Sequence, residues 1–134
     1  MSHPRILFLC DRNAVRSPMA AALAGHGAAS AGLMPDDAVD PFAVGCLLEN
    51  GIDISAHTPH HVTPDTITPD TVVISLTLGA FGEARIWKQD RGFELEFWDL
   101  PEVPAHDQPR DMIMDGYRAI REALKAHIRN RFGK

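Results

Sequence analysis

The chain has 134 residues, of which 45% are hydrophobic and 23% are charged, and its formal net charge is -5 at pH 7. A chain of this length buries a core large enough to fold without disulfides or a structural metal, so we predict a single domain over residues 1–134. The negative charge excludes a general attraction to nucleic acids and anionic membranes, so we expect neither as a partner and attribute any phosphate binding to a local site.

The first predicted element is a short buried strand over residues 5–9, where an apolar run is closed by polar residues. The apolar run at residues 6–9 is far too short for a signal peptide or a membrane span, so we predict a cytoplasmic location. Thiols stay reduced in that compartment, and we therefore expect Cys10 and Cys46 to be free. Two thiols are also too few for a cysteine-based zinc site.

A helix and a second strand follow. Residues 11–13 are polar and interrupt the first strand, and the helix begins at Ser17 and extends to about residue 24. Pro18 fits its first turn, where the missing N–H group has no helical partner to lose. Residues 29–32 are predicted to form the second strand.

The next predicted helix covers residues 42–50, with Asp40 as its N-cap and Gly51 as its stop. Cys46 lies within this helix beside two leucines, and we expect it in the core. The segment 57–70 is polar and contains three prolines, which predicts a loop with room for one short helix.

The histidines of this loop have no carboxylate at ligand spacing, so we expect them to be exposed to solvent. We therefore predict no metal site at these histidines. The histidines concerned are His57, His60 and His61.

Residues 71–76, with the sequence TVVISL, are predicted to form the strongest strand, because the segment is apolar and rich in β-branched residues. Residues 79–92 are predicted to form a loop and a short helix around Trp87. A further strand is predicted at residues 94–98.

Residues 99–109 form a proline-rich loop, and residues 111–132 are predicted to form a long amphipathic helix. The alternation of strands and helices along the chain predicts an α/β fold, in which a parallel sheet carries helices on both faces. The apolar stripe expected on the last helix comprises Met112, Ile113, Tyr117, Ile120, Leu124 and Ile128.

The residues that carry chemistry lie between the first strand and the first helix. Ligands bind outside the carboxyl ends of the strands in such sheets, and a loop that leads into a helix points backbone N–H groups at an anion. Arg16 adds a guanidinium fork that matches two phosphate oxygens. We therefore predict a phosphate-binding loop after the first strand, formed by Asp11, Arg12, Asn13, Ala14, Val15, Arg16 and Ser17.

Cys10 stands at the mouth of this loop. The donors that hold a phosphate would also stabilise a thiolate and make Cys10 a nucleophile at neutral pH. We expect the Ser17 hydroxyl to be one of these donors, and we expect Asn13 to lock the loop by bonding its own backbone. The alternative is that Cys10 is a small buried apolar residue at a strand end, which is a frequent role for cysteine.

The segment ILFLC-DRNAVRSPMA resembles the signature of the low-molecular-weight protein tyrosine phosphatases, Cys-x-x-Asn-x-x-Arg-Ser-Pro. SAG at 30–32, VDP at 39–41 and NGIDISAH at 50–57 resemble the next segments of that family in order, and VVISL and FWDLP resemble its later strand and acid loop. The resemblance covers nearly the whole chain. It implies a three-layer α/β sandwich around a four-stranded parallel sheet.

The resemblance also implies a reaction, the hydrolysis of phosphomonoesters by way of a cysteinyl-phosphate. Cys10 attacks phosphorus, and Arg16 and the loop amides hold the phosphoryl oxygens. A carboxylic acid protonates the leaving oxygen and then activates water. The implied reaction needs no metal and no cofactor. The implied substrate is a phosphorylated protein or a small aryl phosphate, and we expect a monomer or a weak homodimer.

The acid loop departs from the family pattern. The family supplies an aspartate in an Asp-Pro pair, whereas this chain has Glu102 followed by Val103, with Asp99 as a second candidate acid. The loop also lacks the aromatic residues that often grip an aryl substrate in the family. The aromatic candidates elsewhere for lining the cleft are Phe81, Trp87 and Trp98, and a place in the core is the alternative for Trp98.

Two other functions remain open. An arsenate reductase on the same scaffold would need an external thiol, because no cysteine follows Cys46 to provide an internal relay. A non-catalytic phosphate-binding module would keep the loop and lose the acid, and the replacement of the Asp-Pro pair by Glu102 and Val103 favours that alternative.

Overall fold

The computed structural model describes residues 5–25 and 27–133. Four strands, four α-helices and one short 3-10 helix make up this part of the chain. In order they are β1 (Arg5–Cys10), α1 (Arg16–Ala24), β2 (Ala29–Gly32), α2 (Pro41–Leu48), η1 (Pro64–Thr66), β3 (Thr71–Ser75), α3 (Leu78–Arg91), β4 (Glu94–Phe97) and α4 (Arg110–Phe132).

The four strands form one sheet in the order β2-β1-β3-β4, and every neighbouring pair is parallel. Cys10 pairs with Gly32 of β2, and Ser75 pairs with Phe97 of β4. The carboxyl ends of all four strands therefore meet at one edge of the sheet. This is the edge at which an α/β sheet of this kind binds ligands.

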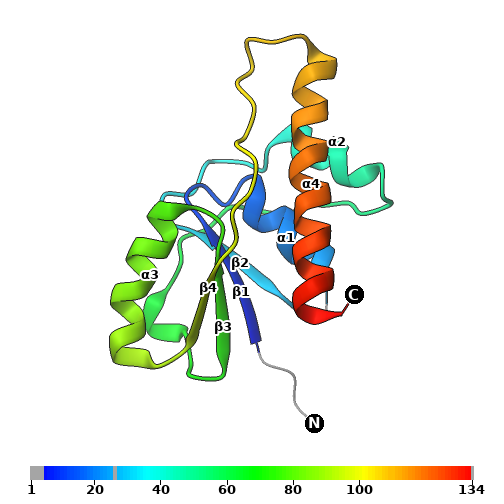
Figure 1. Cartoon of the computed structure of the whole chain (residues 1–134). Helices are drawn as coiled ribbons and strands as arrows, with labels where there is room; N and C mark the ends of the chain where they lie inside the picture. The colour runs from blue at the N-terminus through cyan, green and yellow to red at the C-terminus, as the bar shows by residue number, and fades with distance from the viewer. Residues whose placement is uncertain (1–4, 26, 134) are drawn as a thin grey trace.

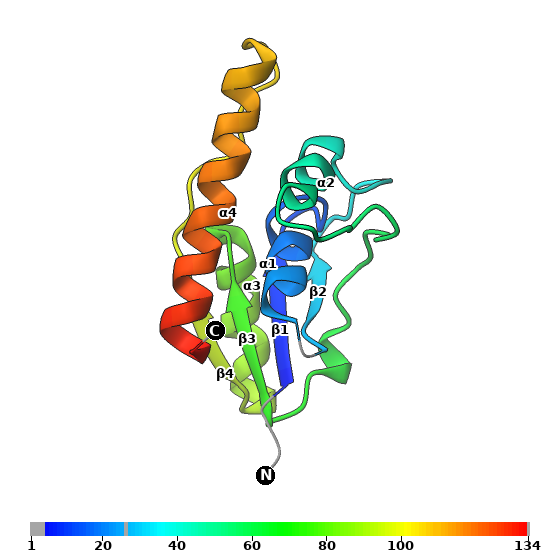
Figure 2. The same cartoon turned by 90° about the vertical axis from the view of Figure 1, so that its right-hand side faces the viewer.

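Helices cover both faces of the sheet, as the sequence predicted. Figure 1 shows α3 on one side and α1 and α4 on the other, and in Figure 2 α2 lies beyond α1, next to the upper half of α4. The strands alternate accordingly: Ile74 belongs to the core under α1 and α4, and Val73 belongs to the core under α3. The result is a three-layer α/β sandwich.

The prediction for residues 79–92 was wrong, because the structure has one continuous helix, Leu78–Arg91. The Thr77 hydroxyl caps this helix by accepting from the amide of Ala80 at 3.1 Å. Ala80 and Ala84 are fully buried against the sheet. That tertiary packing outweighs the low helix propensity of the two glycines in the first turns.

The stripe predicted for α4 is correct except at Met112, which is 56% exposed. Successive residues of a helix are rotated by about 100°, so Met112 cannot share the face of its neighbour Ile113. The remaining five residues are buried under α1 and α2: Ile113, Tyr117, Ile120, Leu124 and Ile128. Within the part of the chain that the structure describes, α4 and the other helices are each too short or too polar to span a membrane.

Candidate active site

The loop between β1 and α1 turns its carbonyl groups outward. The carbonyl oxygens of Asp11 and Arg12 accept from the amides of Met34 and Asp36 at 2.7 and 3.0 Å. The carbonyl oxygen of Ala14 accepts from the amide of Asp40 at 3.0 Å. Because C=O and N–H point in opposite directions across a peptide, the loop amides face the opposite side, where they can surround an anion. We call residues 10–17 the cradle.

Two donors converge on the sulfur of Cys10, which is 4% exposed. The Asn13 amide lies 3.3 Å from Sγ, and the Ser17 Oγ lies 2.8 Å from Sγ. The Ser17 oxygen already accepts from Asn13 Nδ2 at 2.8 Å, so its own hydrogen is available to the sulfur. Hydrogen bonds from both sides stabilise a thiolate, and they distinguish Cys10 from a cysteine packed only against apolar side chains.

Asn13 is the centre of the cradle. It is fully buried and has a φ of 53°, in the left-handed region that asparagine tolerates better than most residues. Its side-chain amide donates to Ser17 and to Ser30 Oγ at 3.0 Å, and its side-chain oxygen accepts from the amide of His60 at 3.0 Å. The prediction that Asn13 bonds its own backbone was therefore wrong, because the side chain joins the cradle to α1, β2 and the 57–60 segment.

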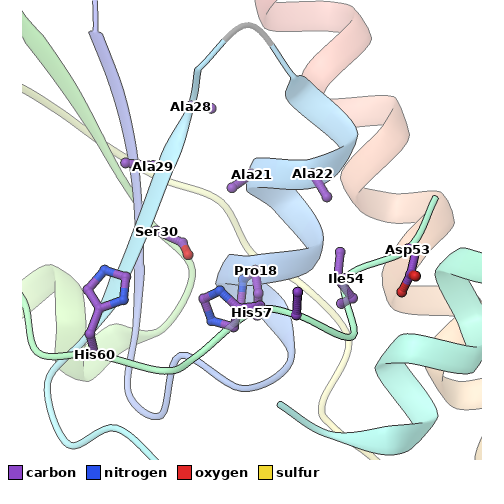
Figure 3. Close-up of a pocket in the computed structure, with 11 residues that line it drawn as sticks. Pro18, Ala21, Ala22, Ala28, Ala29, Ser30, Asp53, Ile54, His57 and His60 are labelled. Carbon is purple, nitrogen blue, oxygen red and sulfur yellow. The ribbon is translucent and has the colours of Figure 1, made fainter. Parts of the chain in front are cut away.

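His57 also supports the cradle. Its Nε2 lies 3.0 Å from the carbonyl oxygen of Asn13, and a carbonyl only accepts, so Nε2 carries the hydrogen. The expected solvent exposure was wrong for His57, which is half-buried, and correct for His60 and His61. Figure 3 shows His57 beside Pro18 at a pocket of about 420 Å³ between α1, the edge of β2 and the 53–60 segment.

The end of β2 lies unusually close to the cradle. A Cβ atom at Gly32 would lie 2.9 Å from the Cβ of Asn13 and 3.0 Å from the carbonyl oxygen of Asp11. Only glycine leaves room for this approach. The close approach of β2 to the cradle therefore explains why the SAG segment ends in glycine at position 32.

Arg16 is the first residue of α1 and is half-buried. Its side chain borders two adjoining hollows, one of about 340 Å³ shared with Cys10, Asp40 and Val103 and one of about 500 Å³ that continues toward β4. Among residues 5–25 and 27–133 no carboxylate forms an ion pair with this guanidinium. An unpaired guanidinium beside the sulfur suits an incoming oxyanion.

The larger hollow, which we call the cleft, brings the two candidate acids together with Arg16. Asp99 and Glu102 are both exposed residues, and both line the cleft. The cleft also contains two residues that the sequence did not single out, Phe97 and Thr77. Phe97 had no signal apart from the resemblance of the FWDLP segment.

The other predicted cradle residues contribute through their backbone. The Asp11 carboxylate accepts from Thr77 Oγ1 at 2.8 Å, and the Arg12 guanidinium pairs with Asp36 at 3.5 Å. Ala14 is buried and Val15 is half-buried. Within the described part of the chain the hydrogen bonds to Cys10 Sγ come from Asn13 and Ser17, so the role of these four residues in the cradle rests on their amides.

The aromatic residues named from the sequence do not line the cleft. Trp98 is 5% exposed and packs against Phe8 with ring centroids 5.6 Å apart, so it belongs to the core. Trp87 and Phe81 lie on α3, where Trp87 packs against the core under that helix. Phe97 is the aromatic residue at the cleft because it ends β4, at the carboxyl edge of the sheet.

An all-parallel four-stranded sheet with a cysteine at the end of β1 and an arginine at the start of α1 defines a class of α/β oxyanion-binding proteins. The model of one family, low molecular weight phosphotyrosine protein phosphatase, matches residues 5–132. The chain belongs to this family, which confirms the resemblance seen in its sequence.

Known relatives include both phosphatases and arsenate reductases. A glutaredoxin arsenate reductase from Synechocystis sp. is 27% identical over 135 residues, which is 97% of each chain. The structure of an arsenate reductase in the oxidized state is 29% identical with a TM-score of 0.72, covering 95% of each chain. The low molecular weight protein tyrosine phosphatase from T. tengcongensis is 24% identical, also with a TM-score of 0.72 and 95% of each chain covered.

Proposed function

We propose that this protein is a phosphomonoester hydrolase of the protein tyrosine phosphatase type, acting through a cysteinyl-phosphate. The observation that carries the proposal is the pair of hydrogen bonds from Asn13 and Ser17 to Cys10 Sγ, beside the unpaired guanidinium of Arg16. A thiolate in this environment can attack the phosphorus of a phosphate ester whose oxygens are held by the cradle amides and Arg16.

The reaction has two steps. In the first step the Cys10 thiolate attacks phosphorus, the S–P bond forms, the P–O bond breaks and the leaving oxygen takes a proton from a carboxylic acid. In the second step water attacks phosphorus, the carboxylate takes a proton from the water, and the S–P electron pair returns to sulfur as inorganic phosphate leaves. Arg16 and the cradle amides hold the remaining oxygens throughout, where charge accumulates in the transition state.

Glu102 is our proposed acid, with Asp99 as the second candidate. Both residues line the cleft with Arg16. Glu102 precedes Val103, which lines the smaller hollow with Cys10 and is packed against the core. That neighbour anchors Glu102 close to the cradle, whereas Asp99 lies at the base of the loop, directly after the buried Trp98.

The proposed substrate is a phosphorylated protein or a small aryl phosphate. Apolar side chains of Leu78, Phe97 and Leu100 form part of the cleft wall and suit an aryl group. The carboxylates of Asp11 and Asp99 at the same cleft oppose further negative charge on the leaving group. We also propose that the protein acts as a monomer or weak homodimer in the cytoplasm, where its nucleophile stays reduced.

Arsenate reduction with an external thiol is the second candidate, favoured by the 27% identity to an arsenate reductase over 97% of the chain. Arsenate would bind as phosphate does and form an S–As bond with loss of water. An external thiol then attacks Cys10 Sγ, the S–As electron pair passes to arsenic to give arsenite, and a mixed disulfide remains. Cys46 is fully buried and its sulfur lies 3.6 Å from Arg121, so the attacking thiol has to come from outside.

One experiment compares the two activities. The purified protein is given p-nitrophenyl phosphate, and separately arsenate with glutathione and glutaredoxin, while released phosphate and arsenite are measured. We expect repeated phosphate turnover and, after rapid acid quenching, a phosphate-labelled Cys10. Arsenite formation without phosphate release would support the reductase instead. Phosphate binding without either product would support the non-catalytic module.

A further inference from the structure

Tyr117 occupies a junction that the proposed chemistry leaves unused. It is fully buried on α4, and it is the only tyrosine of the chain. Its hydroxyl donates to Asp40 Oδ2 at 2.7 Å and lies 3.0 Å from His106 Nε2. The phenol has one hydrogen and a carboxylate only accepts, so His106 Nε2 must be the donor to the phenol oxygen.

The hydroxyl keeps its hydrogen across the working pH range. Burial first, and then the hydrogen bond to the Asp40 carboxylate, raise the pKa of Tyr117 well above its ordinary value. The neutral Tyr117 hydroxyl therefore donates to the Asp40 carboxylate and accepts from the imidazole N–H of His106.

Asp40 connects this junction to the cradle. Its Oδ1 caps α2 by accepting from the amide of Phe42 at 2.7 Å, and its own amide donates to the carbonyl of Ala14 at 3.0 Å. Asp40 also lines the smaller hollow with Cys10 and Val103. Asp40 therefore joins the Tyr117 hydroxyl to the rigid part of the site, next to the cradle.

His106 connects the same junction to the 99–109 loop. Two residues earlier, Pro104 packs so closely on α4 that a Cβ atom at Gly116 would overlap its ring. Phe42 completes the contact: it stacks on Tyr117 at 5.4 Å between ring centroids and meets the edge of His106 at 5.0 Å. The segment that follows Glu102 is therefore attached to α4 and α2 at Pro104 and His106.

We propose that Tyr117 is a positioning residue, whose hydroxyl ties the 99–109 loop through His106 to Asp40 and thereby holds Glu102 over the cradle. The inference rests on the proposed function for its catalytic consequence only. The attachment itself is a property of the fold and can be measured without turnover.

The first test is amide hydrogen exchange in Tyr117→Phe, which keeps the ring stack and removes both hydrogen bonds. We expect faster exchange in residues 99–109 and unchanged exchange in α3. His106→Ala should reproduce the effect. Gln108→Ala is the matched control, because it removes only a bond within the loop, to the carbonyl of Ala105. Equal exchange in wild type and Tyr117→Phe, or a loss of protection that extends through α3, would overturn the inference.

The second test uses leaving groups of different basicity. A poor leaving group such as phenolate needs the positioned acid, and p-nitrophenolate needs it far less. We expect Tyr117→Phe to lower kcat/KM, which reports the first step only, by about 10-fold for phenyl phosphate and much less for p-nitrophenyl phosphate, and to leave inhibition by inorganic phosphate unchanged. Equal losses for both esters would contradict positioning of the acid. A wild-type protein that hydrolyses neither ester would refute the proposed function, while the exchange experiment would still decide the role of Tyr117.

Discussion

The two loops that meet at the cleft are built in different ways. The cradle is held by buried contacts: Asn13 alone forms hydrogen bonds to α1, β2 and the 57–60 segment. The 99–109 loop carries its candidate acids, Asp99 and Glu102, on exposed positions, and its attachments to the rest of the fold include Val103, Pro104 and His106. The proposed oxyanion capture therefore rests on a loop held by buried hydrogen bonds, whereas the proposed acid catalysis rests on side chains at exposed positions.

Removal of the proposed nucleophile, Cys10, should have the largest effect, because it separates phosphate binding by the cradle from turnover. We expect Cys10→Ser to lower turnover of p-nitrophenyl phosphate by at least about 10³-fold, because no covalent intermediate forms. Phosphate binding, measured by calorimetry, should persist, because the amides and Arg16 remain. Cys46→Ala is the control and should keep its activity, since Cys46 is buried on α2. Full activity of Cys10→Ser would refute the mechanism.

Substitutions of the two candidate acids test the contribution of the 99–109 loop to turnover. We expect Glu102→Gln to lower kcat for phenyl phosphate by about 10²-fold, the usual contribution of a general acid, and to remove the part of the pH–rate profile that depends on a protonated carboxyl. Asp99→Asn should cost less than about 10-fold by the same measure. A larger loss for Asp99→Asn would transfer the role of acid to Asp99.

Substitutions of Asn13 test how much the buried hydrogen bonds of the cradle contribute to the free energy of unfolding. We expect Asn13→Ala to lower the free energy of unfolding by about 3 kcal/mol, because it leaves buried partners on Ser17, Ser30 and His60 unpaired. Asn13→Gly removes the same bonds but relieves the left-handed backbone, so it should be about 1 kcal/mol more stable than the alanine variant. Urea unfolding measures both. Equal stability of all three proteins would show that the bonds contribute little.

The smallest expected effect concerns Ser75, a buried polar residue that differs from Asn13 in having no partner for its side chain among the described residues. Ser75 at the end of β3 is fully buried, and its hydroxyl has no hydrogen-bond partner among the described residues. Ser75→Ala removes a desolvated group without creating a large cavity, so we expect the free energy of unfolding to rise by up to about 1 kcal/mol. Thermal unfolding of the variant checks this, and a clear loss of stability would reveal a contact that the hydroxyl makes.

Much of the fold followed from local patterns. The apolar strand before Cys10, the proline at the start of α1 and the Asp40 cap of α2 each act within a few residues, and the structure agrees with all three. The helix α3 did not follow, because its first turns contain glycines and its stability comes from the burial of Ala80 and Ala84 against the sheet. The prediction that Met112 belongs to the apolar stripe of α4 was wrong for a geometric reason, since Met112 lies outside the buried face of that helix.

By itself the sequence determined the order of elements, the α/β class and the residue types of the cradle, because Cys10, Asn13, Arg16 and Ser17 lie within one strand–loop–helix unit whose geometry is local. Tertiary structure alone decided which distant groups complete the site. His57 and Ser30 reach Asn13, and Tyr117 reaches Asp40, across separations of 17 to 77 residues. Such contacts depend on how helices pack on the sheet, and no local spacing in the chain encodes them.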